Sequence, residues 1–421
     1  MQRTLIDISP GQVIGFCLAV SLFELLTYMA SDLIMPAMLA VTLELEADAR
    51  HVPYAFNLYL IGGVCLQWLI GPLSDRFGRR RLLLSGCLLF GVACAATFGT
   101  SSIEAFNLLR LMQGMGLGFV VAVSYPALQE VFREADAVRL MALLGNVALL
   151  SPLLGPLLGS LLLEWLSWRT LFLGLGLAAA VAWLGLYVCM PETIDVMRND
   201  GQQQAPVAFN ARQVGHRYLT LLGNRHFLYA SLALGLMSLP LIAWIGLSPL
   251  LLMQLLGLSS REYGLWQIPI FGAVIVGNLI LDRLLASHSL TRVIRIALWP
   301  LCLGLTGLIG TALFSTALPL LIASLSLYAI GLGMSNAALY RLALFASDDS
   351  KGLVSATIGM LSIVVMGTGG SLIAAVGGAD SLEGFALCAA LAGLLCLPLI
   401  RRFVHLSKQP NLAPATPEEA R

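Results

Sequence analysis

The sequence predicts an all-α membrane protein with twelve transmembrane helices in two six-helix bundles. Hydrophobic residues make up 58% of the 421 residues, charged residues make up 11%, and the mean hydropathy is +0.87. Apolar runs of about 20 residues, each long enough to cross about 30 Å of hydrocarbon, recur from end to end. One long polar segment divides the runs six and six. Water-soluble domains are far less apolar, so lipid is the expected solvent.

Each predicted span is an apolar run between charged or Gly/Pro-rich breaks. The first run is too long for a signal-peptide core, and we expect it to be retained. The runs begin near Val13, Val52, Leu82, Ile103, Leu140, Trp168, Phe227, Tyr263, Val293, Leu318, Leu353 and Gly384. The predicted parts are a first bundle at 1–190, a cytoplasmic linker at 191–225, a second bundle at 226–405 and a cytoplasmic tail at 406–421. The linker should contain a short surface helix near Arg212 to Leu222.

Lys and Arg residues are distributed unevenly between the two sides of the predicted membrane. Nearly all of those outside the spans fall on the side of the N-terminus, the linker and the tail. The other side carries only Arg50, Arg169 and Arg261. By the positive-inside rule, both termini are expected to be cytoplasmic.

Short strings recur at matching places in the two halves. GPLSDR (Gly71 to Arg76) follows the second span and GNLILDR (Gly277 to Arg283) follows the eighth, while MQGMGLG in the fourth span resembles AIGLGM in the tenth. Chance recurrence of small residues is an equal alternative for these strings alone. Together with the six-plus-six division, they favour two facing bundles around a central site.

Several classes of chemistry find no support in the sequence. The eight cysteines form no CxxC pair, and the five histidines lie in polar connections or at span ends, which argues against a metal site. No G-x-x-x-x-G-K-[ST] string is present to bind a nucleotide, and the spans contain no nucleophile-plus-base string. We therefore expect no enzyme, no cofactor, no metal and no nucleic-acid partner.

The string GPLSDRFGRRRLL (Gly71 to Leu83) predicts a tight turn between the second and third spans. Its glycines permit close backbone approach, Asp75 can accept hydrogen bonds at a neighbouring helix N-terminus, and the arginines should hold the turn at the headgroup surface. The spacing resembles the signature loop of the major facilitator superfamily, with Ser74 and Arg80 where alanine and lysine are usual. The resemblance implies the major facilitator fold and a gating motif made of Gly71, Asp75, Arg76, Gly78 and Arg79.

Two further stretches are similar to motifs of this family. RLMQGMGLG, which begins at Arg110, resembles the fourth-span motif, in which the family ties an embedded arginine to proton coupling. GNVALLSPLLGPLLGS resembles the fifth-span antiporter motif and favours export, with Ser160 where glycine is usual. Close packing of a helix pair is the alternative reading, because small residues let helices approach. The antiporter-motif residues are Gly145, Pro152, Gly155, Pro156 and Gly159.

Two carboxylates lie inside the first span, where a lone one costs about 2.5 to 3.5 kcal/mol on insertion scales. Glu24 lies about 17 Å into the span, and Asp32 lies about 12 Å nearer the outer surface. Arg110 has a depth close to that of Asp32, so we expect one polar network, directly, through water or through the first-span backbone. We predict proton coupling by Asp32, Glu24 and Arg110. The alternative is a static pair of Asp32 and Arg110 beside a neutral Glu24.

The predicted cavity between the bundles is mainly apolar. Resemblance to drug exporters of the family implies several substrate neighbours, although Ser31 replaces the usual asparagine, and Trp244 is a further lining candidate. Ordinary helix packing is an alternative for each of these side chains. The predicted substrate-binding residues are Glu24, Tyr28, Asp32, Phe56, Leu60, Tyr125, Asn146 and Leu236.

The resemblance implies a monomeric transporter of the bacterial inner membrane. Its expected activity is the export of lipophilic, often cationic, drugs in exchange for protons, by alternating access and without a cofactor. The alternative is a proton-coupled transporter of one defined solute, such as a sugar or a single antibiotic.

Overall fold

The structure is a computed structural model and describes residues 4–49, 51–133, 140, 151–152, 154–199, 201, 203, 211–285, 287–314, 317–347 and 351–406. Within these residues the chain is almost entirely helical. The described residues form no β-sheet; their β-type pairing consists of two isolated bridges, one between Thr4 and Phe132 and one between Met197 and Gln203.

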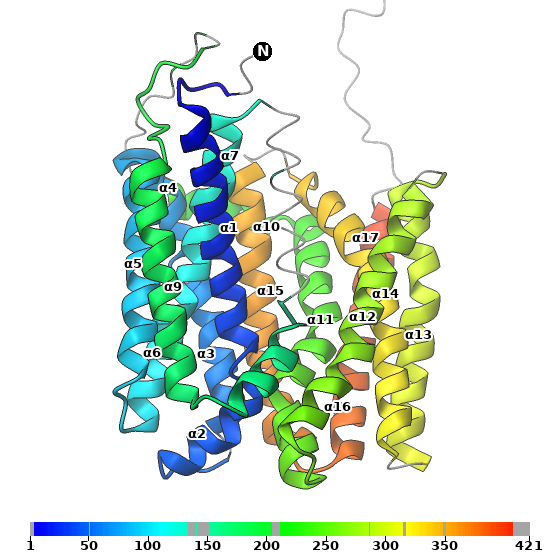
Figure 1. The fold of residues 1–421 in the computed structure, drawn as a ribbon. Coiled ribbons are helices and arrows are strands. Elements are labelled where there is room, and N and C mark those ends of the chain that lie inside the picture. Colours follow the sequence, from blue (N-terminus) through cyan, green and yellow to red (C-terminus); the bar gives the residue numbers. More distant parts are fainter. Residues whose placement is uncertain are drawn as a thin grey trace, which may run out of the picture.

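The helices follow one another as an up-and-down series (Figure 1). The first half contains α1 (Pro10–Asp32), η1 (Met35–Ala37), α2 (Met38–Glu44), α3 (His51–Cys65), α4 (Gln67–Phe77), α5 (Arg79–Thr97), α6 (Ile103–Phe119), η2 (Val120–Ser124), α7 (Tyr125–Val131), a shorter helix at Leu154–Leu163, and α9 (Trp168–Cys189). The second half contains α10 (Ala211–Gly223), α11 (Arg225–Ser248), η3 (Pro249–Leu255), α12 (Ser260–Leu285), α13 (Leu290–Phe314), α14 (Leu318–Leu344), α15 (Lys351–Ile373), η4 (Ala374–Gly378), α16 (Leu382–Leu394) and α17 (Cys396–Leu406).

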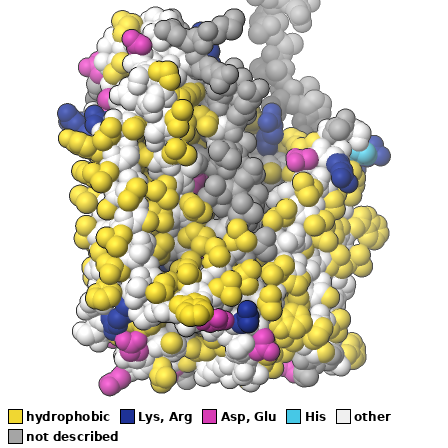
Figure 2. Space-filling model, viewed as in Figure 1, with side chains coloured by type: hydrophobic (Ala, Val, Ile, Leu, Met, Phe, Trp, Pro, Cys, Tyr) yellow, Lys and Arg dark blue, Asp and Glu magenta, His cyan; other side chains and the backbone are white. Residues whose placement is uncertain are grey.

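The predicted spans match these helices. Eleven helical stretches of the described chain are long and apolar enough to cross a membrane, and each begins within about one turn of its predicted start. The fifth predicted span, from near Leu140, lies partly outside the described residues and ends in the helix Leu154–Leu163. Hydrophobic side chains cover the middle of the face in Figure 2, and charged ones gather toward its two ends. The all-α membrane fold is confirmed, and α10 confirms the predicted surface helix.

Polar caps and prolines explain where many helices begin and break. The hydroxyl of Ser9 accepts from the backbone N–H of Gln12 and caps α1, and Ser102 caps α6 in the same way. Pro36 lies in the 3-10 turn η1, and Pro249 begins the π-helical segment η3. Prolines lack a backbone N–H and so interrupt the helical hydrogen-bond ladder, and at these two places they bend the span without ending it.

Figure 1 shows the first-half helices on one side of the molecule and most of the second-half helices on the other. In the first half α3 packs on α6, and α5 and α1 pack on α9; in the second, α14 packs on α12 and α13, and α11 packs on α15. The halves meet where α15 and α11 contact α3 and where η1 contacts α12. Asn57 Nδ2 donates a hydrogen bond of 2.8 Å to Ser371 Oγ across this boundary.

The recurring strings mark equivalent helix contacts in the two halves. A Cβ added to Gly114 of MQGMGLG would lie 1.9 Å from the carbonyl oxygen of Tyr59, on the second span. A Cβ added to Gly333 of AIGLGM would lie 2.3 Å from the carbonyl oxygen of Val274, on the eighth. Glycine permits backbone contact at both places, because any side chain would clash there. The strings therefore share one packing role, which makes chance recurrence the weaker explanation.

Candidate functional site

Glu24 lies in the middle of α1 with 0% of its surface exposed. The phenol of Tyr125, the first residue of α7, donates a hydrogen bond of 2.9 Å to its Oε1 atom. Its Oε2 atom has no hydrogen-bond partner among the described residues. A buried carboxylate with one unpartnered oxygen can hold a proton or meet a cation, since burial of a bare charge is costly.

Asp32 is the last residue of α1 and is also buried. The hydroxyl of Ser151 donates a hydrogen bond of 2.8 Å to its Oδ2 atom. Gly155 lies so close that an added Cβ would be 2.7 Å from the Asp32 Cβ. The fifth span therefore both binds the carboxylate and leaves no room for a larger side chain beside it.

Arg110 lies on α6 with 0% of its surface exposed. Its Nη1 atom donates hydrogen bonds of 2.8 Å to the carbonyl oxygen of Ala30 and to Oε1 of Gln113, and its Nε donates to the carbonyl oxygen of Ala55 at 3.3 Å. The guanidinium lies 4.6 Å from the ring centroid of Tyr59, at a distance typical of a cation–π contact. Its Nη2 atom has no hydrogen-bond partner in the described chain.

Asp32 and Arg110 are linked through the backbone of the first span. No ion pair within 4.0 Å joins them among the described residues, and Arg110 instead binds the carbonyl of Ala30, two residues before Asp32. The predicted contact with the first-span backbone is therefore present, whereas a direct pair is not. Their part in proton coupling stays a prediction. A carboxylate that no cation holds tightly can exchange a proton at lower cost than an ion-paired one.

Every buried acidic or basic side chain of the described residues belongs to the first half. These residues are Glu24, Asp32, Arg79, Arg110 and Glu130. The sequence led us to expect this asymmetry, because no carboxylate lies centrally in spans seven to twelve.

The described members of the predicted substrate-binding set lie on four spans, the first, second, fourth and seventh. Phe56 is buried on α3, and its ring faces α11, where a Cβ added to Gly246 would lie 3.6 Å away. Tyr28, Leu60, Tyr125 and Leu236 are half-buried, and Tyr125 alone of these has a side-chain hydrogen bond to Glu24. Asn146 lies outside the described residues.

Trp244 does not line an open cavity in this structure. It is 0% exposed, its indole N–H donates a hydrogen bond of 2.7 Å to Gln267 Oε1, and its ring packs edge-on against Phe385. These contacts lie within the second half, so packing accounts for this tryptophan.

The gating-motif turn contains a buried charge cluster. Arg79 Nη2 lies 2.7 Å from Asp75 Oδ1 and 2.9 Å from Glu130 Oε1, and Arg79 Nε donates to the other Glu130 oxygen at 3.2 Å. Oε1 of Glu192, just after α9, accepts a hydrogen bond of 2.8 Å from the Arg79 backbone N–H. The cluster therefore ties the ends of the second, fourth and sixth spans together.

Two expectations for this turn are wrong. Arg79 is 5% exposed and points inward, because two carboxylates satisfy it there, whereas Arg76 is exposed as expected. A Cβ added to Gly71 would meet no described atom within 4 Å, so no close approach requires this glycine. Gly78 does require one, since its φ is 101° and a Cβ would lie 2.2 Å from a Glu192 carboxylate oxygen.

The fifth-span residues pack as their small size predicts. A Cβ added to Gly159 would lie 2.1 Å from the carbonyl oxygen of Leu33. Pro156 belongs to the helix Leu154–Leu163, and Pro152 is also helical. The Ser160 hydroxyl donates to the carbonyl oxygen of Pro156 at 2.6 Å. Gly145 lies outside the described residues. The motif thus holds the fifth span against the end of α1, beside Asp32.

Sequence reasoning missed several polar partners of the site. Gln113 accepts from Arg110 and donates at 2.8 Å to the Thr97 hydroxyl, and Ser151 binds Asp32. Gln113 lies one helical turn after Arg110, and that spacing could have identified it. Ser151 lies in the motif string, but only the rotation of the fifth span shows where it points.

Comparisons with known proteins agree with this architecture. The model of the Major Facilitator Superfamily matches residues 20–369. The Multidrug transporter MdfA of Yersinia pestis is 44% identical over 409 residues, which cover 96% of this chain and 98% of that protein. The protein of the same name from an Escherichia coli strain is 43% identical over 359 residues, covering 85% and 86%. A crystal structure of a D-xylose-proton symporter has a TM-score of 0.75 at 15% identity, covers 93% of this chain and 98% of that one, and shows the fold alone.

Proposed function

Because the chain belongs to the Major Facilitator Superfamily, we propose that it exports lipophilic, often cationic, drugs in exchange for protons. Relatives that are 42 to 44% identical over most of the chain are named multidrug transporters, which places this protein among transporters and not enzymes. One structural observation carries the proposal furthest. It is the fully buried Glu24 carboxylate, which one phenol binds and whose second oxygen has no partner in the described chain.

The two carboxylates would have different tasks. Glu24 lies deeper in the membrane, and a cationic substrate can compensate its free oxygen. Asp32 lies beside Ser151 and near the Arg110 anchor, so we assign the transported proton to it. Substrate entry and burial favour its protonated form, while the nearby arginine favours the charged form. Competition between these influences couples drug and proton.

Alternating access would arise from rocking of the two bundles around this site. Inward proton movement supplies about 2.3 kcal/mol per charge per 100 mV, so no cofactor is required. The multi-pass chain would lie in the inner membrane as a monomer, with both termini in the cytoplasm.

Transport in proteoliposomes tests this function. With an imposed pH gradient, the purified protein should accumulate a lipophilic cation, and chemically unrelated lipophilic drugs should compete with it. Competition by a single chemical class would instead favour a transporter of one defined solute. Uptake that never saturates would contradict a carrier altogether.

A further inference from the structure

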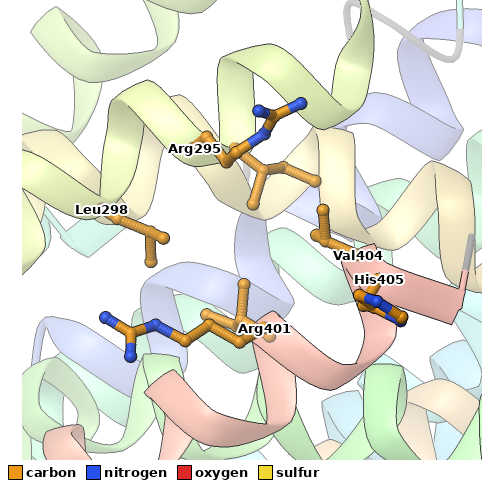
Figure 3. A pocket seen from close by; sticks show the side chains of 7 residues that line it. Arg295, Leu298, Arg401, Val404 and His405 are labelled. Carbon is orange, nitrogen blue, oxygen red and sulfur yellow. The ribbon is translucent and has the colours of Figure 1, made fainter. Parts of the chain in front are cut away.

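A groove lies between the start of α13 and the end of α17, far along the chain from the predicted drug site. Its volume is about 270 Å³, and apolar side chains from the two helices form its walls (Figure 3). These side chains are Ile294, Leu298, Ile400 and Val404. The neighbouring Trp299 is 73% exposed and Leu395 is 59% exposed, as expected of helices that face lipid. The groove therefore opens toward the hydrocarbon and not toward water alone.

Two arginines stand beside this apolar groove. Arg295 comes from α13 and Arg401 from α17, and both are exposed. Neither makes an ion pair or a hydrogen bond with a described residue. By contrast, the adjacent Arg402 donates to the Tyr229 hydroxyl at 3.4 Å. No acidic side chain of the described residues lines the groove, so nothing in that part of the chain compensates the positive charge of the two guanidinium groups there.

The depth of the groove in the membrane is set by the fold. Consecutive spans alternate in direction, so the start of α13 and the end of α17 lie at the same end of the molecule as the Gly78 turn (Figure 1). Arginines that are exposed at span ends, as Arg295 and Arg401 are, lie at the level of lipid headgroups. At the headgroup level, an apolar groove beside two arginines without a partner in the described chain matches a molecule with a negatively charged head and an apolar tail.

We propose that this groove binds an anionic phospholipid. The phosphate lies at the mouth of the groove, where the exposed side chains of Arg295 and Arg401, one from each wall, can turn toward it and donate charge-assisted hydrogen bonds. One acyl chain lies along the apolar walls. Basic sites between transmembrane helices bind anionic headgroups by the same chemistry. This site is separate from Glu24 and Asp32, so it goes beyond the transport function.

Native mass spectrometry of the full chain, released from detergent, tests this site. The probes are phosphatidylglycerol, which is anionic, and phosphatidylethanolamine, which is zwitterionic, with identical acyl chains. The wild type should retain the anionic lipid more strongly than the zwitterionic one. The double variant Arg295→Gln/Arg401→Gln should lose about tenfold or more of this retention, because each cation near the surface contributes about 1 kcal/mol. Leu298→Trp, which fills the groove and keeps both charges, should weaken retention of both lipids.

Arg283→Gln/Arg292→Gln is the matched control, since both arginines are exposed at the same end but do not line the groove. It should retain the anionic lipid like the wild type. An equal loss in this control, or equal retention of the two lipids by the wild type, would overturn the proposal. Displacement of the lipid by excess inorganic phosphate would point to a phosphate site instead. A severalfold gain in retention after removal of residues 407–421 would show that the tail occupies the groove.

Discussion

The phenol oxygen of Tyr125 donates a hydrogen bond of 2.9 Å to Oε1 of Glu24, and so joins the fourth span to the centre of the first. A hydroxyl that donates to a carboxylate oxygen stabilises the charged form relative to the same carboxylate without that donor. The second oxygen, Oε2, has no partner in the described chain. The Glu24 carboxylate is thus held in position by one hydrogen bond, while its second oxygen can still accept a proton or meet a cation.

Tyr125→Phe removes this bond and keeps the ring. We expect affinity for a lipophilic cation to fall about threefold to tenfold, in line with about 0.5–1.5 kcal/mol for one hydrogen bond. Affinity for an uncharged drug of similar size should change little, because it does not need the charged carboxylate. Equilibrium binding of both compounds to the purified protein makes the comparison, and equal losses for the two would contradict the assigned role of Glu24.

Gly159→Ala places a methyl group against the backbone oxygen of Leu33, which cannot move aside without shifting α1. Overpacking of this kind costs about 1–3 kcal/mol, so the thermal midpoint in detergent should fall by several degrees. Gly174→Ala on α9 is the matched control, because an added Cβ there meets no described atom within 4 Å. Its midpoint should stay the same or rise slightly, and similar losses in both variants would refute the packing argument.

Glu130→Gln leaves the buried Arg79 with a single carboxylate partner, Asp75. Removing one member of a buried charge pair costs about 3–5 kcal/mol, and we expect a loss toward the lower end because Asp75 remains. Arg76→Gln removes an exposed charge from the same turn and should change stability by about 0.5 kcal/mol or less. Chemical denaturation of the variants in detergent measures both effects; a nearly neutral Glu130→Gln would mean that the cluster does not stabilise this conformation.

Asn57 and Ser371 join the two halves through one hydrogen bond of 2.8 Å. Asn57→Ala and Ser371→Ala should each shift the population away from this conformation about twofold to tenfold. Since both changes delete the same bond, the double variant should behave like either single one. Distance measurements between labels on the two halves report the shift, and additive effects would show that this bond does not couple them.

The positions of the described helices along the chain, and the depth of the buried charges in the membrane, could be predicted from the sequence. Hydropathy located the described spans within about one turn, and the 1.5 Å rise placed Arg110 near Asp32 before the contact with Ala30 was known. Hydropathy does not specify how each helix is rotated, because spans that are apolar all round present no distinct core face. Ser151 beside Asp32 was therefore not foreseen.

Contacts between the ends of different spans could not be predicted from the sequence either. Glu130 lies in the last turn of the fourth span and Glu192 follows the sixth, and only the packing of those spans brings both to Arg79. A positive-inside count treats every arginine as a headgroup anchor, which is why the buried position of Arg79 was missed. Gly71 was misjudged for a related reason, since a motif string does not show which of its glycines meets a neighbour.

The central claim is that Asp32 carries the proton that drug binding displaces, while Glu24 meets the charge of the drug. Drug-driven proton release from the purified protein tests it most directly, for the wild type and for Glu24→Gln and Asp32→Asn separately, with the exposed-site variant Asp282→Asn as control. We predict release by the wild type and the control, loss of release in Asp32→Asn, and reduced release with cationic drugs in Glu24→Gln. Proton release equal to that of the wild type in both span variants would contradict the account.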